Sequence, residues 1–459
     1  MAAAGVACAL AMAVAGCGGS GGGAGAGSGA HSTQPGALTV YSDLSVDGPS
    51  GATGATGARQ SVAQQQSIEN GARLALEQWG HTVRYGRGGH RGSFHVYFHP
   101  LADSNPTTGQ WSQDLTAANA QVVSSAASAV AYIGDFDSAA TALSLPALSP
   151  GGILQVSPWS PYVGFTDPDP ADGKGDPARF HAPNGSNDFA RMIPSDVKQA
   201  EAIVSYMASL GVTRLYVLGD VSVFDAAIAQ LVANDAPAAG IAVVGQLPNI
   251  DTGTNTEPRG YAPIVSGVAA LRPDAVLFGG TASVGAVALW QELHAKLPHA
   301  KLFAPATLAT PAFLDGIAAA GASCSGPAGA TVLCYPAAGS TYVTSPMLER
   351  RQYPASAQAV FHAYYRRFHS TATVYALYGY AAMEDVLNAI RLTGRFTTDH
   401  QRLLDVFFHH LGRIGSGTAG GVIGTYTIDG NGDSSLTAFD GYRVNSAGAL
   451  VFGQRIRLR

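Results

Sequence analysis

Residues that could carry chemistry occur in a few short groups, and each group lacks part of the pattern that a reaction needs. Residues 415–420 have the GxGxxG spacing of a dinucleotide-binding loop, but a helix-like run precedes them and a strand-like run follows, the reverse of such a site. The turn at 429–433 has only part of a calcium-binding loop. No P-loop, HExxH or CxxC motif is present. We therefore expect no enzyme, no metal site and no cofactor.

Four aspartates crowd the loop at 167–176, but their spacing is not that of an EF-hand. We interpret this loop as solvated acidic surface. The whole chain has 459 residues, a net charge of −5 and only 12% charged residues, which argues against nucleic-acid binding. A chain of this length with 46% hydrophobic residues can bury a sizeable core in about two to three units of roughly 150 residues.

The N-terminus is typical of an exported lipoprotein. Residues 2–16 are apolar or small, and with Cys17 they end in the lipobox-like tetrapeptide VAGC. This run is shorter than the roughly 20 apolar residues of a membrane span. No basic residue precedes it, and a buried N-terminal helix is the alternative. We expect a signal peptide at 1–17, acylation of Cys17 and a Gly/Ala/Ser tether at 18–36.

Beyond the lipobox, the chain has two cysteines, Cys324 and Cys334. An extracytoplasmic location permits a disulfide between them, and two unpaired buried thiols are the alternative. Two cysteines alone do not make a zinc site, which normally takes four ligands.

Strand-like and helix-like runs alternate after the tether. The first series predicts helices at 67–80 and 111–125 and strands at 37–44, 94–98, 129–133 and 152–156. A second series follows the turn-rich segment at 166–187, with strands at 214–218, 241–246, 275–278 and 300–303. Short apolar strands between helices predict two α/β lobes with parallel sheets, whose ligands bind beyond the carboxyl ends of the strands. The tail predicts an antiparallel hairpin of 421–428 with 441–452 around the turn at 429–433.

Nine stretches in order resemble the branched-chain amino-acid (Leu/Ile/Val-binding) class of ABC-transporter substrate-binding proteins, actinobacterial lipoproteins in particular. They include LTVYSDL at 38–44, AYIGDFDSAAT at 131–141, ILQVSPWSPYVGFT at 153–166 and RPDAVLFGG at 272–280. The resemblance implies the type 1 periplasmic-binding fold, with two Rossmann-like lobes and a three-crossing hinge. Lobe 1 is expected at 38–192 plus 335–412 and lobe 2 at 193–334 plus 413–459, with crossings near 192–194, 333–336 and 412–420.

The resemblance also implies a function and its partners. A small molecule binds between the lobes, stabilises the closed form and is delivered to the permease subunits of an ABC transporter. The chain would lie outside the cell membrane, attached to it through the lipid anchor. A ligand-sensing receptor subunit with the same fold is the alternative.

Ligand-binding residues carry over from the family one by one. Ser138 follows the strand AYIG and would bind a ligand carboxylate, and Trp159 lies in the SPWSP loop, where Pro161 stands in place of the usual threonine. Phe224 and Tyr380 stand at aromatic positions of the family, with ordinary core packing as the alternative. The full expected set is Ser138, Trp159, Ser160, Phe224, Thr281, Thr307 and Tyr380.

The position of the acidic residue that pairs with a ligand ammonium group is taken by Ala306 or Thr307. We therefore expect leucine, isoleucine and valine to bind poorly, and a less charged or aromatic-bearing small molecule, such as an amide or a hydrophobic acid, to bind better. A small shift in the alignment would instead bring Asp315 or Asp43 to the ammonium position.

Overall fold

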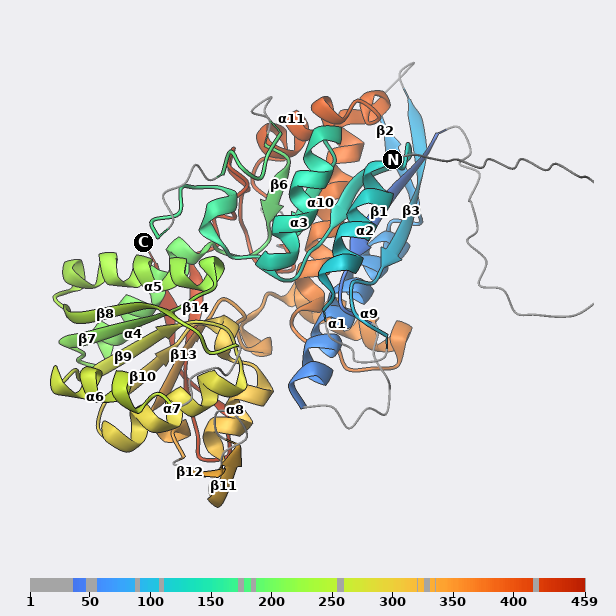
Figure 1. Cartoon of the computed structure of the whole chain (residues 1–459). Helices are drawn as coiled ribbons and strands as arrows, with labels where there is room; N and C mark the ends of the chain where they lie inside the picture. The colour runs from blue at the N-terminus through green and yellow to red at the C-terminus, as the bar shows by residue number, and fades with distance from the viewer. Residues whose placement is uncertain are drawn as a thin grey trace, which may run out of the picture. The chain divides into compact units, whose positions relative to one another are not determined.

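Two large open β-sheets, each flanked by helices, form most of the structure, and a third sheet has only two strands (Figure 1). The computed structural model describes residues 36–46, 56–86, 91–106, 111–171, 177–182, 187–253, 260–319, 321–325, 331–334, 336–415 and 421–458. Both sheets belong to one unit that begins at Gly36. The architecture is the two-lobed α/β arrangement that the sequence predicts.

The first sheet has six strands in the order β2-β3-β1-β4-β5-β6 and is parallel except at the β2 edge. All residues of β4 and β5 are buried, which explains why these strands are apolar throughout: both of their faces are covered. The strands are β1 (Ala37–Asp43), β2 (Thr82–Tyr85), β3 (Gly92–Leu101), β4 (Ala129–Ile133), β5 (Leu154–Ser157) and β6 (Phe189–Arg191).

Helices α1 (Thr56–Gln78) and α10 (Ala376–Thr393) lie side by side against this sheet. Their close approach depends on glycine, because a Cβ on Gly71 would overlap the carbonyl of Ala376 and a Cβ on Gly379 would overlap the carbonyl of Ile68. The first lobe also contains α2 (Gln113–Ser124), α3 (Ser138–Leu148), α9 (Ala355–Phe368) and α11 (His400–His410).

The second sheet has seven strands in the order β15-β14-β13-β10-β9-β7-β8. The pairs from β13 to β8 are parallel, and β14 and β15 add antiparallel strands at one edge. The strands are β7 (Arg214–Asp220), β8 (Ala242–Ile250), β9 (Ala275–Gly279), β10 (Lys301–Ala304), β13 (Thr341–Ser345), β14 (Ala438–Val444) and β15 (Leu450–Arg457). The helices are α4 (Asp196–Ser209), α5 (Val223–Asp235), α6 (Ala262–Ala270), α7 (Val284–Lys296) and α8 (Pro311–Ala318).

The division of the chain between the lobes differs in detail from the expected ranges. Strand β13, inside the range expected for lobe 1, pairs with β10 in the second sheet. Conversely, Val422, Tyr426 and Ile428, inside the range expected for lobe 2, pack in the hydrophobic core of the first lobe. The segment 345–355 therefore carries the chain from the second sheet back to α9.

The expected C-terminal hairpin is wrong in its position. The hairpin is β14 with β15, and its turn lies at residues 445–449, where the Asn445 side chain accepts hydrogen bonds from the backbone N–H groups of Ala447 and Ala449. Residues 421–428 form no named strand, and their apolar side chains pack on the first lobe. The turn at 429–433 is present. It closes a short antiparallel bridge between Ile428 and Ser434, and its Gly432 carbonyl accepts a hydrogen bond from the Arg191 N–H of β6.

Several expectations lie outside the described residues. The signal peptide, Cys17 and the tether precede residue 36, most of the GxGxxG segment falls in 416–420, and Asp172 and Asp176 are also outside. Strands β11 (Gly321–Ser325) and β12 (Thr331–Cys334) are antiparallel, with Cys324 across from Val332 and Cys334 across from Gly321, but their side chains are not described. The disulfide stays a prediction. Among the described residues, no helix combines the length and apolar character of a membrane crossing.

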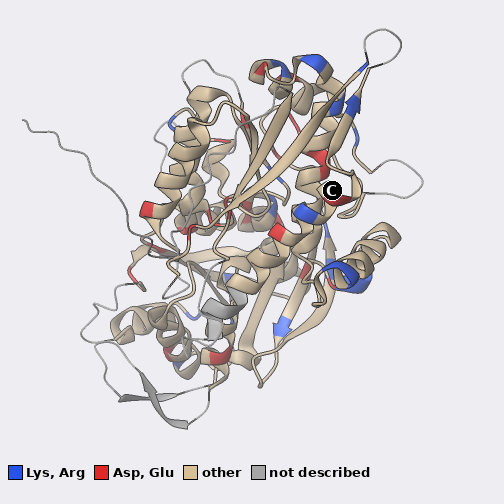
Figure 2. Cartoon of the chain, turned by 90° about the vertical axis from the view of Figure 1, so that its right-hand side faces the viewer, with Lys and Arg blue, Asp and Glu red and all other residues tan. Residues whose placement is uncertain are grey.

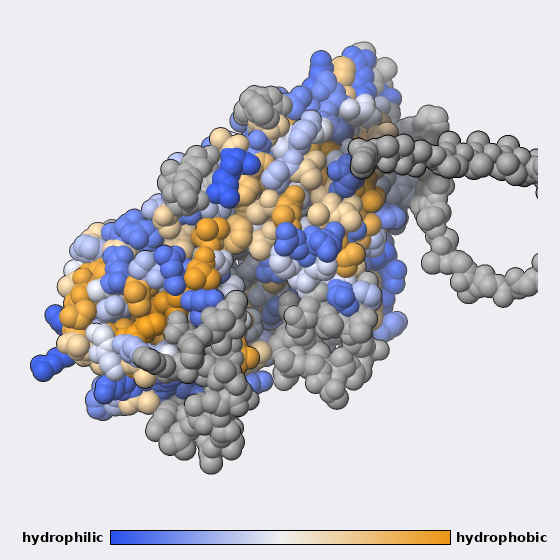
Figure 3. Space-filling view, in the orientation of Figure 1, coloured by the Kyte–Doolittle hydropathy of each residue, from blue (hydrophilic) through white to orange (hydrophobic). Residues whose placement is uncertain are grey.

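Charged residues are sparse along the ribbon in the view of Figure 2, in keeping with the composition. On the face shown in Figure 3, apolar residues reach the surface of the second lobe between polar ones. Exposed apolar side chains include Val221 and Val223 beside the start of α5 and Val284 at the start of α7. They lie at the carboxyl end of the second sheet, which also carries the candidate site.

Candidate functional site

A cavity of about 380 Å³ lies where the carboxyl ends of the strands of both sheets meet. The first lobe contributes the loop after β4 and the loop after β5, and the second lobe contributes the loops after β7, β9 and β10. The volume is in the range of small-molecule sites. The lining residues are Trp111, Asp137, Ser138, Ala139, Trp159, Pro161, Asp196, Ser222, Phe224, Asp225, Ile228, Thr281, Pro305 and Thr307.

Five of the seven expected ligand-binding residues line this cavity: Ser138, Trp159, Phe224, Thr281 and Thr307. Ser138 is the first residue of α3, where free backbone N–H groups and the helix dipole favour an anionic or hydrogen-bond-accepting ligand group. Thr307 approaches from the opposite lobe, and its hydroxyl donates a weak hydrogen bond of 3.4 Å to the Gly280 carbonyl. The structure thus brings these five side chains together, while their role in binding stays a proposal.

The other two expected residues do not line the cavity. Ser160 is fully buried beneath it, and its hydroxyl is 2.5 Å from the hydroxyl of Thr141. Tyr380 packs in the first core on α10, and its hydroxyl donates to Gln78 at 2.8 Å. The structure therefore gives Tyr380 the core position that was its alternative reading.

Trp159 is held by an aromatic cluster. Its ring stacks on Phe136 with centroids 5.6 Å apart and planes at 9°, and Tyr375 lies 5.4 Å away at 48°. The Ser157 hydroxyl accepts hydrogen bonds from the N–H groups of Trp159 and Ser160, which fixes the turn that carries the indole. Trp159 is 6% exposed, so it forms a rigid wall of the cavity.

Three carboxyl groups line the cavity at positions other than the Ala306 or Thr307 position considered from the sequence. Asp137 precedes α3, Asp196 begins α4, and Asp225 lies in the first turn of α5. Burial raises the pKa values of Asp196 and Asp225 to about 7, whereas Asp137 is exposed to solvent. Arg191 opposes the shift at Asp196. At Asp225 a hydrogen bond from Ser222 opposes the shift, and the charges of Asp220 and, less strongly, Asp137 add to it.

Sequence reasoning missed these three residues because each resembles an ordinary acidic residue at a helix N-terminus, where the helix dipole favours it. The signal that could have found them is positional. Each follows the end of a strand directly or after a short loop, at the edge where ligands of parallel sheets bind.

The loop that carries Trp159 is fixed from below by Arg191, which is fully buried at the end of β6. Its Nη1 donates to the carbonyls of Ser160 and Tyr162 at 2.9 and 2.8 Å, and its Nη2 donates to Thr166 Oγ1 at 2.6 Å. Its Nε lies 2.7 Å from Asp433 Oδ1 in an ion pair.

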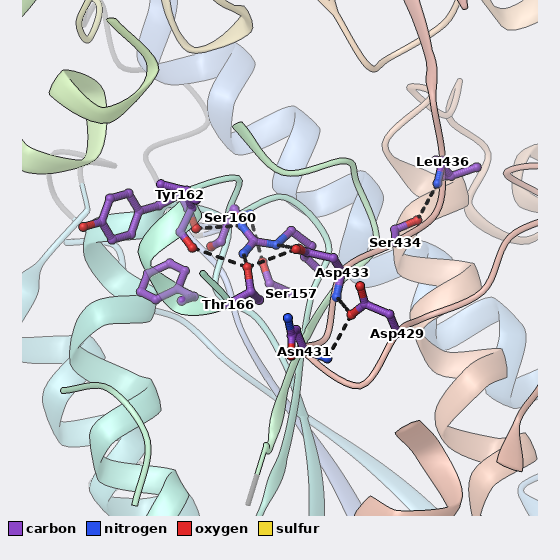
Figure 4. Close-up of polar contacts among 12 residues, drawn as sticks. Ser157, Ser160, Tyr162, Thr166, Asp429, Asn431, Asp433, Ser434 and Leu436 are labelled. Carbon is purple, nitrogen blue, oxygen red and sulfur yellow. Dashed lines mark hydrogen bonds and ion pairs between the residues drawn. The ribbon is translucent and has the colours of Figure 1, made fainter. Parts of the chain in front are cut away.

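Asp433 belongs to the turn at 429–433, so this turn contacts the base of the Trp159 loop. Figure 4 shows Asp433 directed toward Thr166, whose hydroxyl donates to it at 3.1 Å, and Asp429 turned back on its own turn. Asp429 Oδ1 accepts from the N–H groups of Asn431 and Asp433. The acidic residues of this turn are thus engaged in shaping the loop and pairing with Arg191.

A second group of acids, Asp43, Asp103 and Asp135, is buried at the carboxyl ends of β1, β3 and β4, with one oxygen of each within 4.8 Å of the others. Burial and the neighbouring carboxyl groups raise the pKa of Asp43 to about 9, and burial raises that of Asp135 to about 7. Asn119 donates to Asp43, and Tyr132 donates to Asp135 at 2.6 Å.

Neither alternative candidate for an ammonium partner lines the cavity that holds Trp159. Asp43 is 0% exposed within the buried acidic group. Asp315 lines a separate cavity of about 550 Å³, which also has Glu349 and Arg350 in its wall. The carboxyl groups available to a ligand beside Trp159 are therefore Asp137, Asp196 and Asp225.

Comparison with protein families matches residues 108–405 to the family described as periplasmic binding protein. Among solved structures, an ABC transporter substrate-binding protein from Desulfitobacterium hafniense in complex with Leu has a TM-score of 0.63 at 18% identity, covering 90% of this chain and 99% of that one. A leucine binding protein from Thermotoga maritima has a TM-score of 0.61 at 16% identity, covering 92% and 99%.

A solute binding protein of an ABC transporter from R. palustris, in complex with 4-hydroxybenzoate, has a TM-score of 0.63 at 13% identity, covering 92% and 96%. Identities this low establish a shared fold. A search of curated protein sequences gives no match.

Proposed function

The chain belongs to the periplasmic binding protein family, and from that premise we propose that it is an extracytoplasmic solute-binding lipoprotein of an ABC transporter. It captures a small molecule between its lobes and delivers it to the permease. The single observation that carries this proposal is the cavity of about 380 Å³, whose walls come from both lobes. A ligand there contacts both lobes at once and so favours the form in which they are closed.

The two kinds of ligand in the solved neighbours, leucine and 4-hydroxybenzoate, show that proteins of this fold accept chemically different solutes. The fold alone therefore does not identify the ligand, which has to be inferred from the residues that line the cavity. Ser138, Thr281 and Thr307 would supply hydroxyl contacts, and Trp159 and Phe224 would supply apolar walls.

A thermal-shift screen of the purified protein against small amines, amino acids, carboxylates and amides tests capture. A solute that binds the folded state raises the melting temperature by mass action. We expect at least one class to do so in the wild type and to have a much smaller effect on Trp159→Ala. A screen in which every class leaves the melting temperature unchanged contradicts the proposal.

Attachment to the membrane is a separate part of the proposal and rests on the VAGC tetrapeptide that ends in Cys17. We expect the mature protein to begin at Cys17 and to partition with membranes. Cys17→Ser should release the protein, because serine lacks the thiol to which the lipid would be attached. Cys8→Ser is the matched control and should stay bound. Membrane retention of Cys17→Ser at the wild-type level contradicts the anchor.

A further inference from the structure

All the ionisable side chains described in the cavity wall are acidic. Asp137 comes from the first lobe, and Asp196 and Asp225 come from the second. The lining set contains no Lys, Arg or His. When these groups ionise, the cavity carries an excess of negative charge that a ligand has to match.

The protein itself does not neutralise this charge. Within the described ranges, none of the three carboxylates forms an ion pair with a basic side chain. Arg191 acts on Asp196 at longer range, but its guanidinium group is paired with Asp433 at 2.7 Å.

The helix N-termini beside the three carboxylates offset only part of the charge. A helix dipole is equivalent to about half a positive charge. Asp196 and Asp225 are 4% and 5% exposed, and despite the dipoles their burial still disfavours the charged form. A ligand of opposite charge would remove this penalty.

Aromatic rings complete the wall. Trp159 and Phe224 line the cavity from the two lobes, and Trp111, 36% exposed, lies at its edge. Aromatic faces attract ammonium and guanidinium groups and also cover an apolar ligand body. The same residues would leave an anionic group without a charged partner.

We propose that the cargo is an organic cation, a primary amine or guanidine on an apolar or aromatic body, whose charge lies between Asp137 of the first lobe and Asp196 and Asp225 of the second. This inference rests on the proposed function and names its substrate class. It replaces the uncharged or acidic cargo expected from the sequence.

The placement of the carboxylates on opposite lobes couples charge to closure. Asp220 of the same lobe and, to a smaller extent, the exposed Asp137 of the first lobe both disfavour the charged form of Asp225, so closing the empty lobes brings like charges together. A cation between them reverses the sign of this contribution and favours the closed form. An amino acid would add a fourth carboxylate to the same cavity, which works against binding.

The test is a calorimetric titration with two matched series in which only the charge changes. One series is phenethylamine, phenylalanine and hydrocinnamate, and the other is isoamylamine, leucine and isocaproate. We expect at least one amine to bind, about tenfold or more tighter than the amino acid of the same skeleton, and the acids to bind most weakly. Tighter binding of an acid or an amino acid, or absence of binding by both amines, overturns the inference.

Variants locate the effect. Asp137→Asn and Asp225→Asn, one on each lobe, should each weaken amine binding about tenfold or more. Asp315→Asn, in the wall of the other cavity, is the matched control and should leave it unchanged. Binding of an acid that Trp159→Ala abolishes would overturn the cationic cargo and leave the proposed function standing. If no amine, amino acid or acid bound, the result would count against both the cationic ligand and the proposed function.

Discussion

Phe224 of the second lobe meets Tyr162 of the first edge to face, with ring centroids 5.0 Å apart and planes at 87°. Tyr162 is 1% exposed and packs with Leu145 and Phe165, and Phe224 is packed against this cluster together with Ala227 of α5. The same Phe224 lines the cavity. One aromatic contact therefore links the position of the second lobe to the shape of the site.

Phe224→Ala should favour separation of the lobes. An edge-to-face aromatic pair contributes about 0.5–1.5 kcal/mol, so its loss shifts an open–closed equilibrium by about 2- to 12-fold. Small-angle scattering of the ligand-free variant should show a larger radius of gyration than the wild type. Tyr365→Ala, an exposed aromatic residue of α9, is the control. An unchanged radius in Phe224→Ala counts against this contact as a closure element.

Arg191→Met should lower the free energy of unfolding by about 3–5 kcal/mol, because it leaves Asp433 and the loop carbonyls without their buried partner. Asp433→Asn keeps an acceptor and should cost less. Urea denaturation measures both. Arg351→Met, from an exposed ion pair, is the control and should change stability little. If Arg191→Met and Arg351→Met both lowered the free energy of unfolding only slightly, the proposed stabilising role of the Arg191 guanidinium group would be contradicted.

Stability should fall as the pH rises from about 4 toward 9. The pKa of Asp43 is about 9 in the folded protein, so the folded state keeps a proton that the unfolded chain loses near pH 4. The stabilisation from this bound proton is complete below about pH 4 and is lost as the pH rises to the folded-state pKa. Over that range the free energy of unfolding falls by up to about 1.4 kcal/mol per pH unit. The pKa values of the neighbouring Asp103 and Asp135 are also raised and contribute in the same direction, whereas Tyr132, whose pKa lies well above its usual value, keeps its proton throughout this range.

Asp43→Asn should flatten this dependence, because the amide carries no charge at any of these pH values. The unfolding free energy measured in urea at a series of pH values provides the comparison. Asp405→Asn, at an exposed position of α11, should retain the wild-type slope. An undiminished slope in Asp43→Asn would show that the protonation lies elsewhere.

The pair Cys324 and Cys334 stays a prediction of one disulfide, worth about 3 kcal/mol by the chain-entropy argument for a short loop. Pairing requires a local change of register, because Cys324 lies opposite Val332 and diagonal partners are about 7–8 Å apart. Mass spectrometry of unreduced peptides should show the linked pair, and two free thiols in freshly exported protein would refute it.

A structural feature of this protein can be predicted from the sequence when a local residue pattern specifies it. Runs such as Ala129–Ile133 are apolar because both faces of the strand are covered, so periodicity alone predicts two wound sheets. The crossing of β13 into the second sheet and the packing of residues 422–428 on the first lobe depend on contacts distant in sequence, and no local pattern specifies them.

The residues of the site also fall into those that local sequence predicts and those that it does not. Ser138, Trp159 and Phe224 were within reach because each stands in a recognisable family segment. Asp196 and Asp225 were not, because each satisfies a local rule for helix starts and becomes a cavity residue only when the lobes bring α4 and α5 to α3.

The most direct test of solute capture between the lobes is a calorimetric titration of the best ligand from the thermal screen into four proteins. These are the wild type, Trp159→Ala on the first lobe, Phe224→Ala on the second, and Asp315→Asn in the other cavity. We expect both aromatic variants to bind about tenfold more weakly and Asp315→Asn to bind like the wild type. Binding that survives both aromatic substitutions unchanged, or that only Asp315→Asn weakens, would contradict capture in this cavity.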